Sequence, residues 1–348
     1  MNILLPIAGK SSRFPNTRPK WMLTHPNGNL MIVEAIKGIA KDGDNIFIIY
    51  LKEHEDKFQF RDGLINNLKK SLPDVKLNFI ELNDSTQHQV ETVLLGLQMI
   101  GRDMPFLIKD CDNYFVFDRE IDESKNHVMY ATLDETKNTD PSSKSYIQVN
   151  DFGSVVNIVE KQVISNNFCC GGYFFKSSDE FVKECCKPNN NLNYVSDVIF
   201  SMSLNGSTFE SIKCQDYLDW GTSSEWNSYK DNFMTVFIDL DGVLFYNSSQ
   251  YLKPHIKDAS IIEENVNHIK QLVSTKNVEL IITTARPEEY RNITENQLKD
   301  AGIIYKSLIM GLSHCKRVIV NDFSATNKYP SCESINILRN STNLEDYL

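Results

Sequence analysis

A small, polar and basic loop near the start of the chain has the residue types that bind phosphate groups. Residues 2–7 are largely apolar and are expected to form a short buried strand, which the loop follows at once. Its candidate residues are Gly9, Ser11, Ser12, Arg13 and Lys20. Small residues let the backbone approach phosphate oxygens, and the two cations offset the phosphate charge. A merely basic surface loop is the alternative, but the strand before it and Pro19-Lys20 after it favour a triphosphate site.

A pair of carboxylates is the second feature that could take part in chemistry. Residues 105–109 are expected to form a strand, and Asp110 and Asp112 follow its end. Open α/β sheets bind ligands at the carboxyl ends of their strands, and one aspartate there can hold a hard cation that bridges phosphate oxygens. Structurally idle aspartate pairs are common in loops, so this pair alone favours neither interpretation.

The order of the motifs resembles that of the sugar-phosphate nucleotidyltransferases, whose usual signature is Leu-x-x-Gly-x-Gly-x-Arg-Phe followed by Pro-Lys. The signature residues present here are Gly9, Arg13, Phe14, Pro19 and Lys20. Ser11 stands where the family usually has its second glycine. The resemblance covers about residues 1–230 and implies a GT-A-like, Rossmann-like α/β sheet. It also implies transfer of a nucleotide from an NTP to a phosphorylated sugar or similar alcohol.

The same resemblance suggests roles for further residues. Asp112, in Asp-Asn-Tyr-Phe, aligns with the family's first metal-binding aspartate, and Asp219, in Asp-Trp-Gly-Thr, aligns with the second, which implies Mg²⁺. Glu160 and Lys161 resemble a Glu-Lys pair on the sugar-phosphate side, where Lys161 would hold the acceptor phosphate, and Gly172 would line the sugar. The nucleotide-binding candidates are Ala8, Gly9, Ser11, Ser12, Gln87, Glu91 and Thr92. Helix capping is an equal alternative for Glu91 and Thr92, and an exposed charged strand end is the alternative for Lys161.

A second acidic motif begins in the last third of the chain. Residues 234–238 are expected to form a new strand that runs into Asp239-Leu240-Asp241-Gly242. This motif resembles the first motif of the haloacid-dehalogenase (HAD) phosphohydrolases. In that family the first aspartate attacks phosphorus, and the second gives and takes the proton.

The remaining HAD motifs are expected in order along the chain. Thr284, in Thr-Thr-Ala-Arg, would bind phosphate, and Lys316 would neutralise its charge. Asp322, after a strand expected over residues 318–320, would join Asp239 and Asp241 in binding Mg²⁺. The family often has two acids at this last point, whereas this chain has an asparagine before Asp322.

The elements around these motifs alternate between strands and helices. In the first two-thirds, helices are expected over residues 31–39, 53–72 and 88–100, and strands over 45–51, 75–82, 105–109, 144–149 and 154–159. In the last third, strands are expected over residues 278–282 and 303–309, and helices over 288–301 and after a cap at Asp258. This alternation favours parallel sheets covered by helices. The short spacing of the HAD motifs leaves room for a minimal cap only.

Length and composition limit the number of domains and the kinds of partner that the protein can have. A chain of 348 residues favours two domains, which we expect over residues 1–231 and 232–348. The net charge of −10 argues against an extended nucleic-acid surface. The eight cysteines show no Cys-x-x-Cys spacing and are expected to be reduced. No apolar run approaches the ~20 residues of a membrane span, so we expect a cytoplasmic protein with no membrane partner. A homo-oligomer is left open.

The sequence therefore predicts a bifunctional enzyme that uses Mg²⁺ in both domains. The first domain would form a nucleotide-sugar and pyrophosphate, and the second would hydrolyse a phosphate ester of a precursor or product. A glycosyltransferase of the same general fold is one alternative, because Asp110-x-Asp112 would suit its metal site. Another is a nucleotidyltransferase whose HAD-like domain is a non-catalytic scaffold.

Overall fold

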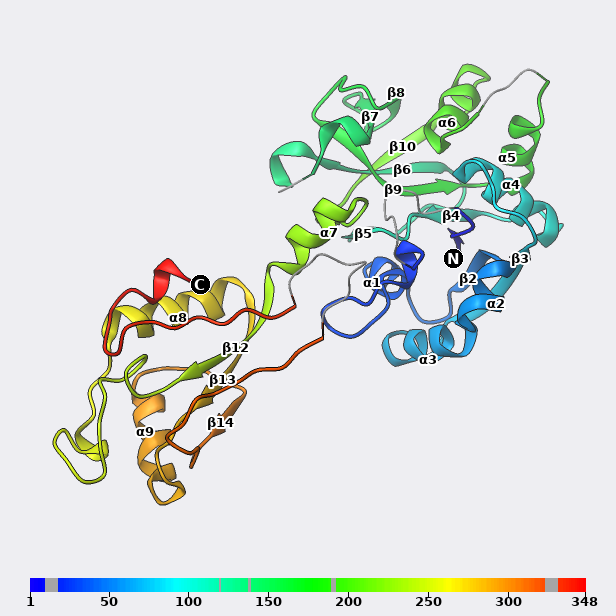
Figure 1. The fold of residues 1–348 in the computed structure, drawn as a ribbon. Coiled ribbons are helices and arrows are strands. Elements are labelled where there is room, and N and C mark those ends of the chain that lie inside the picture. Colours follow the sequence, from blue (N-terminus) through cyan, green and yellow to red (C-terminus); the bar gives the residue numbers. More distant parts are fainter. Residues whose placement is uncertain (10–17, 119, 137–138, 189–191, 323–330) are drawn as a thin grey trace. The chain divides into compact units, whose positions relative to one another are not determined.

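The chain forms two compact units, Met1–Trp226 and Asn227–Leu348, in a computed structural model (Figure 1). The structure describes residues 1–9, 18–118, 120–136, 139–188, 192–322 and 331–348. The division falls within helix α7, Ser223–Lys230, whereas the sequence places the boundary just after that helix.

A large mixed sheet forms the centre of the N-terminal unit. Its main path runs in the order β10-β6-β9-β4-β1-β2-β3. The strands are β1 (Asn2–Pro6), β2 (Asn45–Leu51), β3 (Lys76–Leu82), β4 (Phe106–Lys109), β6 (Asn126–Thr132), β9 (Asn167–Phe175) and β10 (Phe209–Lys213). β9 pairs antiparallel with both β4 and β6, while β1 pairs parallel with β2 and β4. A hairpin of β7 (Ser145–Val149) and β8 (Val155–Glu160) pairs with β9 through β7.

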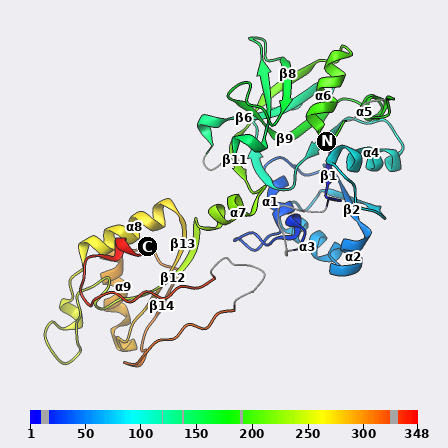
Figure 2. The same cartoon turned by 45° about the horizontal axis from the view of Figure 1, so that its top comes forward.

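Helices cover both faces of this sheet (Figure 2). They are α1 (Met31–Lys37), α2 (Lys52–Phe58), α3 (Arg61–Ser71), α4 (Gln89–Ile100), α5 (Ser178–Cys185) and α6 (Val195–Leu204). Alternate residues of one strand enter different cores: Ile46 and Ile48 of β2 pack with α1 and α3, whereas Ile49 packs with α4. A strand buried on both faces requires such a continuous apolar sequence, which is why β2 was correctly predicted from its composition.

The single helix expected over residues 53–72 is wrong, because the segment forms two helices. Gln59 adopts a left-handed conformation (φ 46°) that ends α2. The Glu55 carboxylate then accepts hydrogen bonds from the backbone N–H groups of Phe60 (3.1 Å) and Arg61 (3.2 Å). Glu55 therefore satisfies free donors at the start of α3, and this side-chain bond leaves no periodic signal.

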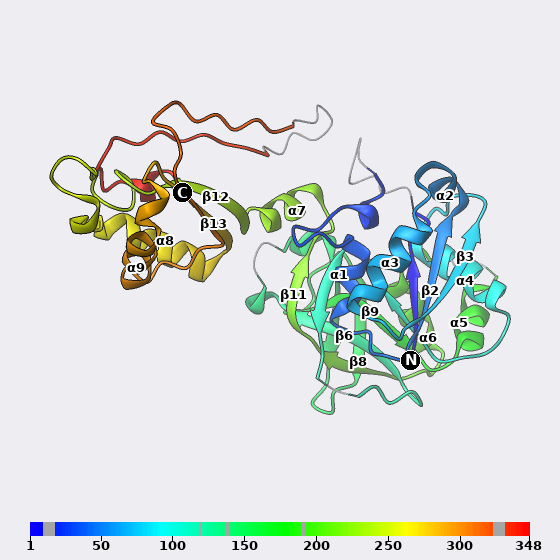
Figure 3. The same ribbon diagram turned by 90° about the horizontal axis from the view of Figure 1, so that it is seen from below.

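The C-terminal unit has a parallel sheet in the order β12-β13-β14 (Figure 1). Figure 3 shows the same unit from below. Its strands are β12 (Phe233–Asp239), β13 (Asn277–Thr283) and β14 (Ser307–Ile309), and its helices are α8 (Glu263–Thr275) and α9 (Arg291–Asp300). Ile238, Val266 and Leu280 lie in the core that joins α8 to this sheet.

Two expectations for this unit are wrong. Asp258 lies in a separate 3-10 turn, Ile256–Asp258, and α8 begins after Ile262 without a side-chain cap. The strand expected over residues 318–320 does not form, and Val318 and Val320 are 69% and 90% exposed. An apolar run is not sufficient for a strand, because a strand also needs a paired neighbour and a buried face.

Two further findings concern membrane-spanning helices and the cysteines. Within the described ranges, no helix combines the length and the apolar composition needed to cross a membrane. All eight cysteines lie in the described parts of the chain, and all are free thiols.

Candidate functional site

A two-stranded ribbon brings the two predicted metal-binding aspartates of the N-terminal unit together. β5 (Asn113–Val116) pairs antiparallel with β11 (Gln215–Asp219), so that Asp219 lies opposite Asn113. The backbone N–H of Trp220 donates to the carbonyl of Asp112 over 2.9 Å. Two motifs far apart in the sequence therefore meet at the end of β4, where the fold would place a ligand.

Each of these aspartates forms an ion pair with a lysine. The Lys20 ammonium contacts Asp112, and the Lys144 ammonium contacts Asp219. Lys20 begins a 3-10 turn, Lys20–Met22, whose other two side chains are buried and anchor it. All four charged side chains are largely buried, with exposed fractions of 17% and 10% for the first pair and 14% and 4% for the second. Sequence analysis missed Lys144, since a single lysine before a strand forms no motif.

The two oxygens of the Asp219 carboxylate have different partners. Its Oδ1 accepts a hydrogen bond from the Gly221 N–H (3.1 Å). Its Oδ2 is buried and lies against the Lys144 ammonium, with no other polar partner in the described part of the chain. No cluster of three or more metal-binding side chains occurs in the described part of the chain. Mg²⁺ usually takes one or two carboxylates plus phosphate oxygens and water, so Asp112 and Asp219 fit this ion.

Asp110, the third carboxylate at this strand end, is half-buried. Burial, together with the negative charge of Asp112, raises the pKa of Asp110 to about 6. The Gln89 amide, on the first turn of α4, donates a hydrogen bond to it. Gly171, at φ 73°, leaves space for this carboxylate, because a Cβ there would clash with Asp110 Oδ2. Asp110 is thus packed into the sheet edge.

A fully buried lysine fixes the loop that carries these aspartates. The Lys109 ammonium donates to the carbonyls of Asp110 (2.7 Å) and Asn113 (2.9 Å) and to the Asn113 side chain. It lies 4.7 Å from the centre of the Phe115 ring. Burial lowers the pKa of Lys109 to about 8. Three hydrogen bonds from one ammonium hold the loop in a single shape.

Of the predicted phosphate loop, Ser11, Ser12 and Arg13 lie outside the described residues. Ala8 is fully buried at the end of the first strand, whereas Gly9 is exposed and has open space around it. The structure therefore describes the two ends of the loop.

The nucleotide-binding candidates at the start of α4 make local contacts. The Glu91 carboxylate accepts from the Gln87 N–H (2.7 Å), and the Glu91 N–H donates to His88 Nδ1 (3.2 Å). Thr92 is buried and shares a 2.5 Å hydrogen bond with Thr86. Helix capping accounts for Glu91, and Thr92 packs inside the unit, while Gln87 keeps an exposed side chain.

The acceptor-side candidates lie at the open end of the β7–β8 hairpin. Glu160 accepts hydrogen bonds from Ser145 and Ser196, which hold it inward. Lys161 is exposed, and its ammonium donates to the Tyr194 hydroxyl over 2.7 Å. Gly172 packs against Phe115, because a Cβ at Gly172 would lie 2.7 Å from that ring.

In the C-terminal unit, motifs one and two meet. Thr284 Oγ1 donates to Asp241 (3.1 Å), and Ser248 Oγ donates to the same carboxylate (2.9 Å). Arg286, which is 3% exposed, donates to both oxygens of Asp241 from Nε and Nη2 over 2.8–3.1 Å. Both oxygens of Asp241 therefore accept hydrogen bonds, and Arg286 supplies the positive charge beside this carboxylate.

Of the other predicted HAD residues, Asp239 lies at the end of β12 opposite Thr283, whereas Lys316 and Asp322 are exposed. Burial raises the pKa of Asp239, and the positive charge of Arg317, 3.3 Å away, opposes that shift. Arg317, and not the predicted Lys316, faces Asp239, while Lys316 is exposed. Asp322 is exposed in a segment that is not a strand, and its carbonyl accepts from the Ser331 hydroxyl. The described residues of this unit therefore do not fit the predicted Mg²⁺ site.

Comparison with known proteins identifies the fold of the larger unit. No protein-family model and no curated protein matches the chain. Among solved structures, a nucleoside-diphosphate-sugar pyrophosphorylase from Vibrio cholerae RC9 has a TM-score of 0.54 at 19% identity, covering 65% of this chain and 98% of that one. The inositol-1-phosphate CTP transferase from T. maritima (TM-score 0.51, 14% identity) covers 64% of this chain and 90% of that one. A UDP-glucose pyrophosphorylase complexed with UDP-glucose has a TM-score of 0.51 at 16% identity, and the match covers 66% of this chain and 98% of that one. The chain carries a sugar-phosphate nucleotidyltransferase fold.

The part of this chain that matches the solved structures, 65% of it for the Vibrio cholerae protein, corresponds in length to the N-terminal unit, Met1–Trp226. The predicted nucleotidyltransferase fold is therefore confirmed. The predicted HAD fold of the C-terminal unit has no such support. At identities of 14–19%, these similarities show the fold alone.

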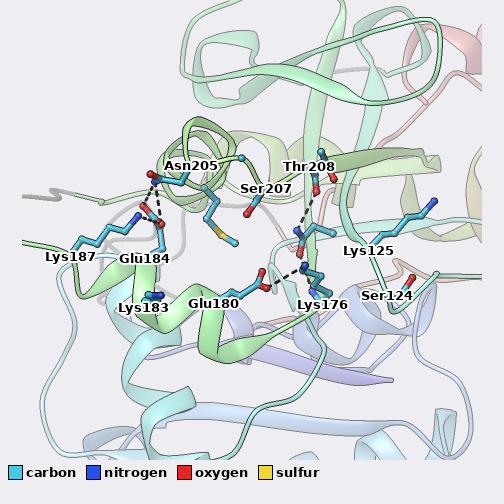
Figure 4. Close-up of a pocket in the computed structure, with 13 residues that line it drawn as sticks. Ser124, Lys125, Lys176, Glu180, Lys183, Glu184, Lys187, Asn205, Ser207 and Thr208 are labelled. Carbon is cyan, nitrogen blue, oxygen red and sulfur yellow. Dashed lines mark hydrogen bonds and ion pairs between the residues drawn. The ribbon is translucent and has the colours of Figure 1, made fainter.

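A pocket of about 380 Å³ lies beside α5, near the starts of β6 and β10 (Figure 4). It is lined mainly by polar residues from α5 and from the segments before β6, α5 and β10, together with Met202 of α6. Several of its lysines pair with glutamates: Lys187 with Glu184 (2.6 Å) and Lys176 with Glu180 (3.3 Å). Glu184 also accepts from Ser201 on α6, so this network joins two helices.

Proposed function

We propose that the N-terminal unit transfers a nucleotide from an NTP to a phosphorylated sugar or similar alcohol. One observation carries the proposal: Asp112 and Asp219 lie together at the end of β4, and each faces a lysine. The nucleotidyltransferase fold around them supports the same conclusion.

The reaction that suits this arrangement is a displacement at phosphorus. An oxygen of the acceptor phosphate attacks the α-phosphorus of the NTP, the bond to the bridging oxygen of the β-phosphate breaks, and pyrophosphate leaves. The protein aligns the two substrates and neutralises their charge. Asp112 and Asp219 would hold Mg²⁺, which supplies Lewis-acid neutralisation when bound.

Lysines supply the remaining positive charge. Lys20 lies beside Asp112, at the end of the predicted phosphate loop, and suits the NTP. Lys161 lies at the open end of the β7–β8 hairpin and suits the acceptor phosphate. We place both substrates between these two groups, with the aspartates at the point of reaction.

Pyrophosphate release from a panel of NTPs and acceptors tests the proposal. Each of CTP, UTP, GTP and dTTP is combined with sugar 1-phosphates and alcohol phosphates in the presence of Mg²⁺. One combination is expected to release pyrophosphate and yield the nucleotide-linked product. Release of a free nucleoside diphosphate from a nucleotide-sugar donor, with no pyrophosphate from any pair, would instead indicate a glycosyltransferase.

A phosphatase in the C-terminal unit is the second candidate function. The observation that favours it is the meeting of Asp239, Asp241 and Thr284 at the ends of β12 and β13. The bidentate Arg286 and the position of Asp322 count against it. If this unit is a phosphatase, Asp239→Asn abolishes phosphate release from a phosphorylated precursor or product and leaves pyrophosphate formation intact. No phosphate release by the unmodified protein would leave the scaffold as the better interpretation.

A further inference from the structure

Lys144 occupies an unusual position beside the candidate metal site. Its ammonium lies against Asp219 Oδ2, a buried oxygen that has no other polar partner among the described residues. Lys144 and Asp219 are 14% and 4% exposed, so water screens the pair only weakly. The ammonium thus supplies the positive charge that Asp219 needs in the absence of a metal.

Lys144 also has a second partner within reach. Its ammonium donates to the Tyr217 hydroxyl over 3.1 Å, and it lies 5.6 Å from the centre of that ring. Its carbonyl accepts from the Lys161 N–H (2.9 Å), which places the two lysine backbones side by side at the hairpin end. A flexible side chain in this position can leave Asp219 and still remain next to the acceptor-side lysine.

We propose that Lys144 is a displaceable counter-ion. Without ligands its ammonium neutralises Asp219; when Mg²⁺ binds there, Lys144 turns to a substrate phosphate. The inference rests on the proposed function and assigns Lys144 as a phosphate-binding residue of that site.

Charge balance makes the exchange favourable only when both ligands arrive. A divalent cation that enters alone must compete with Lys144 for Asp219 and leaves a partly buried ammonium without a counter-charge. A phosphate group supplies that counter-charge. Metal alone should therefore bind weakly, and metal and phosphate should strengthen each other's binding.

Binding of Mn²⁺ alone, followed by electron paramagnetic resonance, tests the proposal without turnover. Lys144→Met should bind Mn²⁺ at least about tenfold more tightly than the unmodified protein, because a positive charge next to the site is gone. Lys161→Met is the matched control. It removes a lysine from the same hairpin end, but its ammonium contacts Tyr194 and, among the described residues, no carboxylate, so Mn²⁺ affinity should change little.

Inorganic pyrophosphate provides the second measurement. Pyrophosphate should raise the Mn²⁺ affinity of the unmodified protein, and this increase should shrink in Lys144→Met. Lys144→Arg, which keeps the charge, should retain weak binding of metal alone. If Lys144→Met is poorly folded, Mn²⁺ should raise its Tm more than that of the unmodified protein.

Unchanged or weaker Mn²⁺ binding by a folded Lys144→Met variant would overturn the proposal. So would an equal gain in Lys161→Met, since this would indicate a general charge effect. Failure of the proposed function gives a different result: no NTP releases pyrophosphate, whereas Lys144→Met still binds Mn²⁺ more tightly.

Discussion

The two units use aspartates after a strand in different ways. In the N-terminal unit, Asp219 Oδ2 has the Lys144 ammonium as its single polar partner among the described residues. In the C-terminal unit, the Asp241 carboxylate accepts hydrogen bonds from two nitrogens of Arg286 and from the hydroxyl groups of Thr284 and Ser248. A lysine is a point charge on a flexible stem, whereas a bidentate guanidinium is fixed in geometry. We therefore propose that Asp219 is the carboxylate that accepts a metal cation, whereas Asp241 is held in the packing around Arg286.

Similar motifs can thus have different chemical capacity. Asp-x-Asp occurs in both units, at Asp110-Cys111-Asp112 and at Asp239-Leu240-Asp241. The partners of the carboxylates decide whether a metal can bind. The following predictions test this difference between the units.

The largest expected effect is on transfer by the N-terminal unit. Asp112→Asn removes a candidate Mg²⁺ ligand without altering core packing, and we expect pyrophosphate release to fall about 100-fold or more. Asp122→Asn is the control, since its side chain is exposed and contacts Ser124 and Lys125 at the other edge of the sheet. Near-normal release by a folded Asp112→Asn variant would remove Asp112 from the site.

Stability separates the two kinds of carboxylate pair. Arg286→Met leaves Asp241 partly buried without its cation, so the C-terminal unit should lose about 3–5 kcal/mol of unfolding free energy. All three tryptophans lie in the N-terminal unit, so their fluorescence should report little change while far-UV circular dichroism shows the loss. Mg²⁺ should not restore this stability, although it should stabilise Lys144→Met. Rescue of Arg286→Met by Mg²⁺ would show that Asp241 is also a metal site.

The loop around Asp110 offers a smaller test. Gly171→Ala forces a Cβ onto the Asp110 carboxylate at a positive φ, and we expect a loss of about 1–3 kcal/mol together with reduced transfer. Gly153→Ala is the matched control, because Gly153 also has a positive φ (81°) but open space around it. Equal losses in the two variants would show that backbone strain alone matters at Gly171.

The smallest expected effect concerns pH. Burial lowers the pKa of His54, whose Nδ1 has no hydrogen-bond partner. The unfolded chain then binds a proton more readily than the folded one, so His54 makes the N-terminal unit less stable as the pH falls below about 6.5. His54→Phe should reduce this acid sensitivity in urea unfolding followed by tryptophan fluorescence. A steeper loss on acidification would contradict the assignment.

The sequence was most informative where one local pattern determines the structure. The apolar run of β2 and the amphipathic helix α4 were predicted within a residue of their observed bounds. The break at Gln59 was missed because it depends on a bond from Glu55 to the next helix.

The candidate sites show the same limit. The convergence of Asp112 and Asp219 follows from an ordered pair of motifs, whereas Lys144 and Arg317 reach their carboxylates only through the fold. Arg286 lies inside the quoted Thr-Thr-Ala-Arg motif, yet its pairing with Asp241 depends on how β12 and β13 align. A residue that belongs to no sequence motif can be recognised as part of a site only from the structure, where distant segments lie together.

Anomalous diffraction from crystals grown with Mn²⁺ and a non-hydrolysable NTP tests the central claim most directly. We expect an anomalous peak at the carboxylates of Asp112 and Asp219, with the Lys144 ammonium moved from Asp219 to a phosphate. A bound nucleotide with no peak at these aspartates, or a peak only at Asp239 and Asp241, would contradict it.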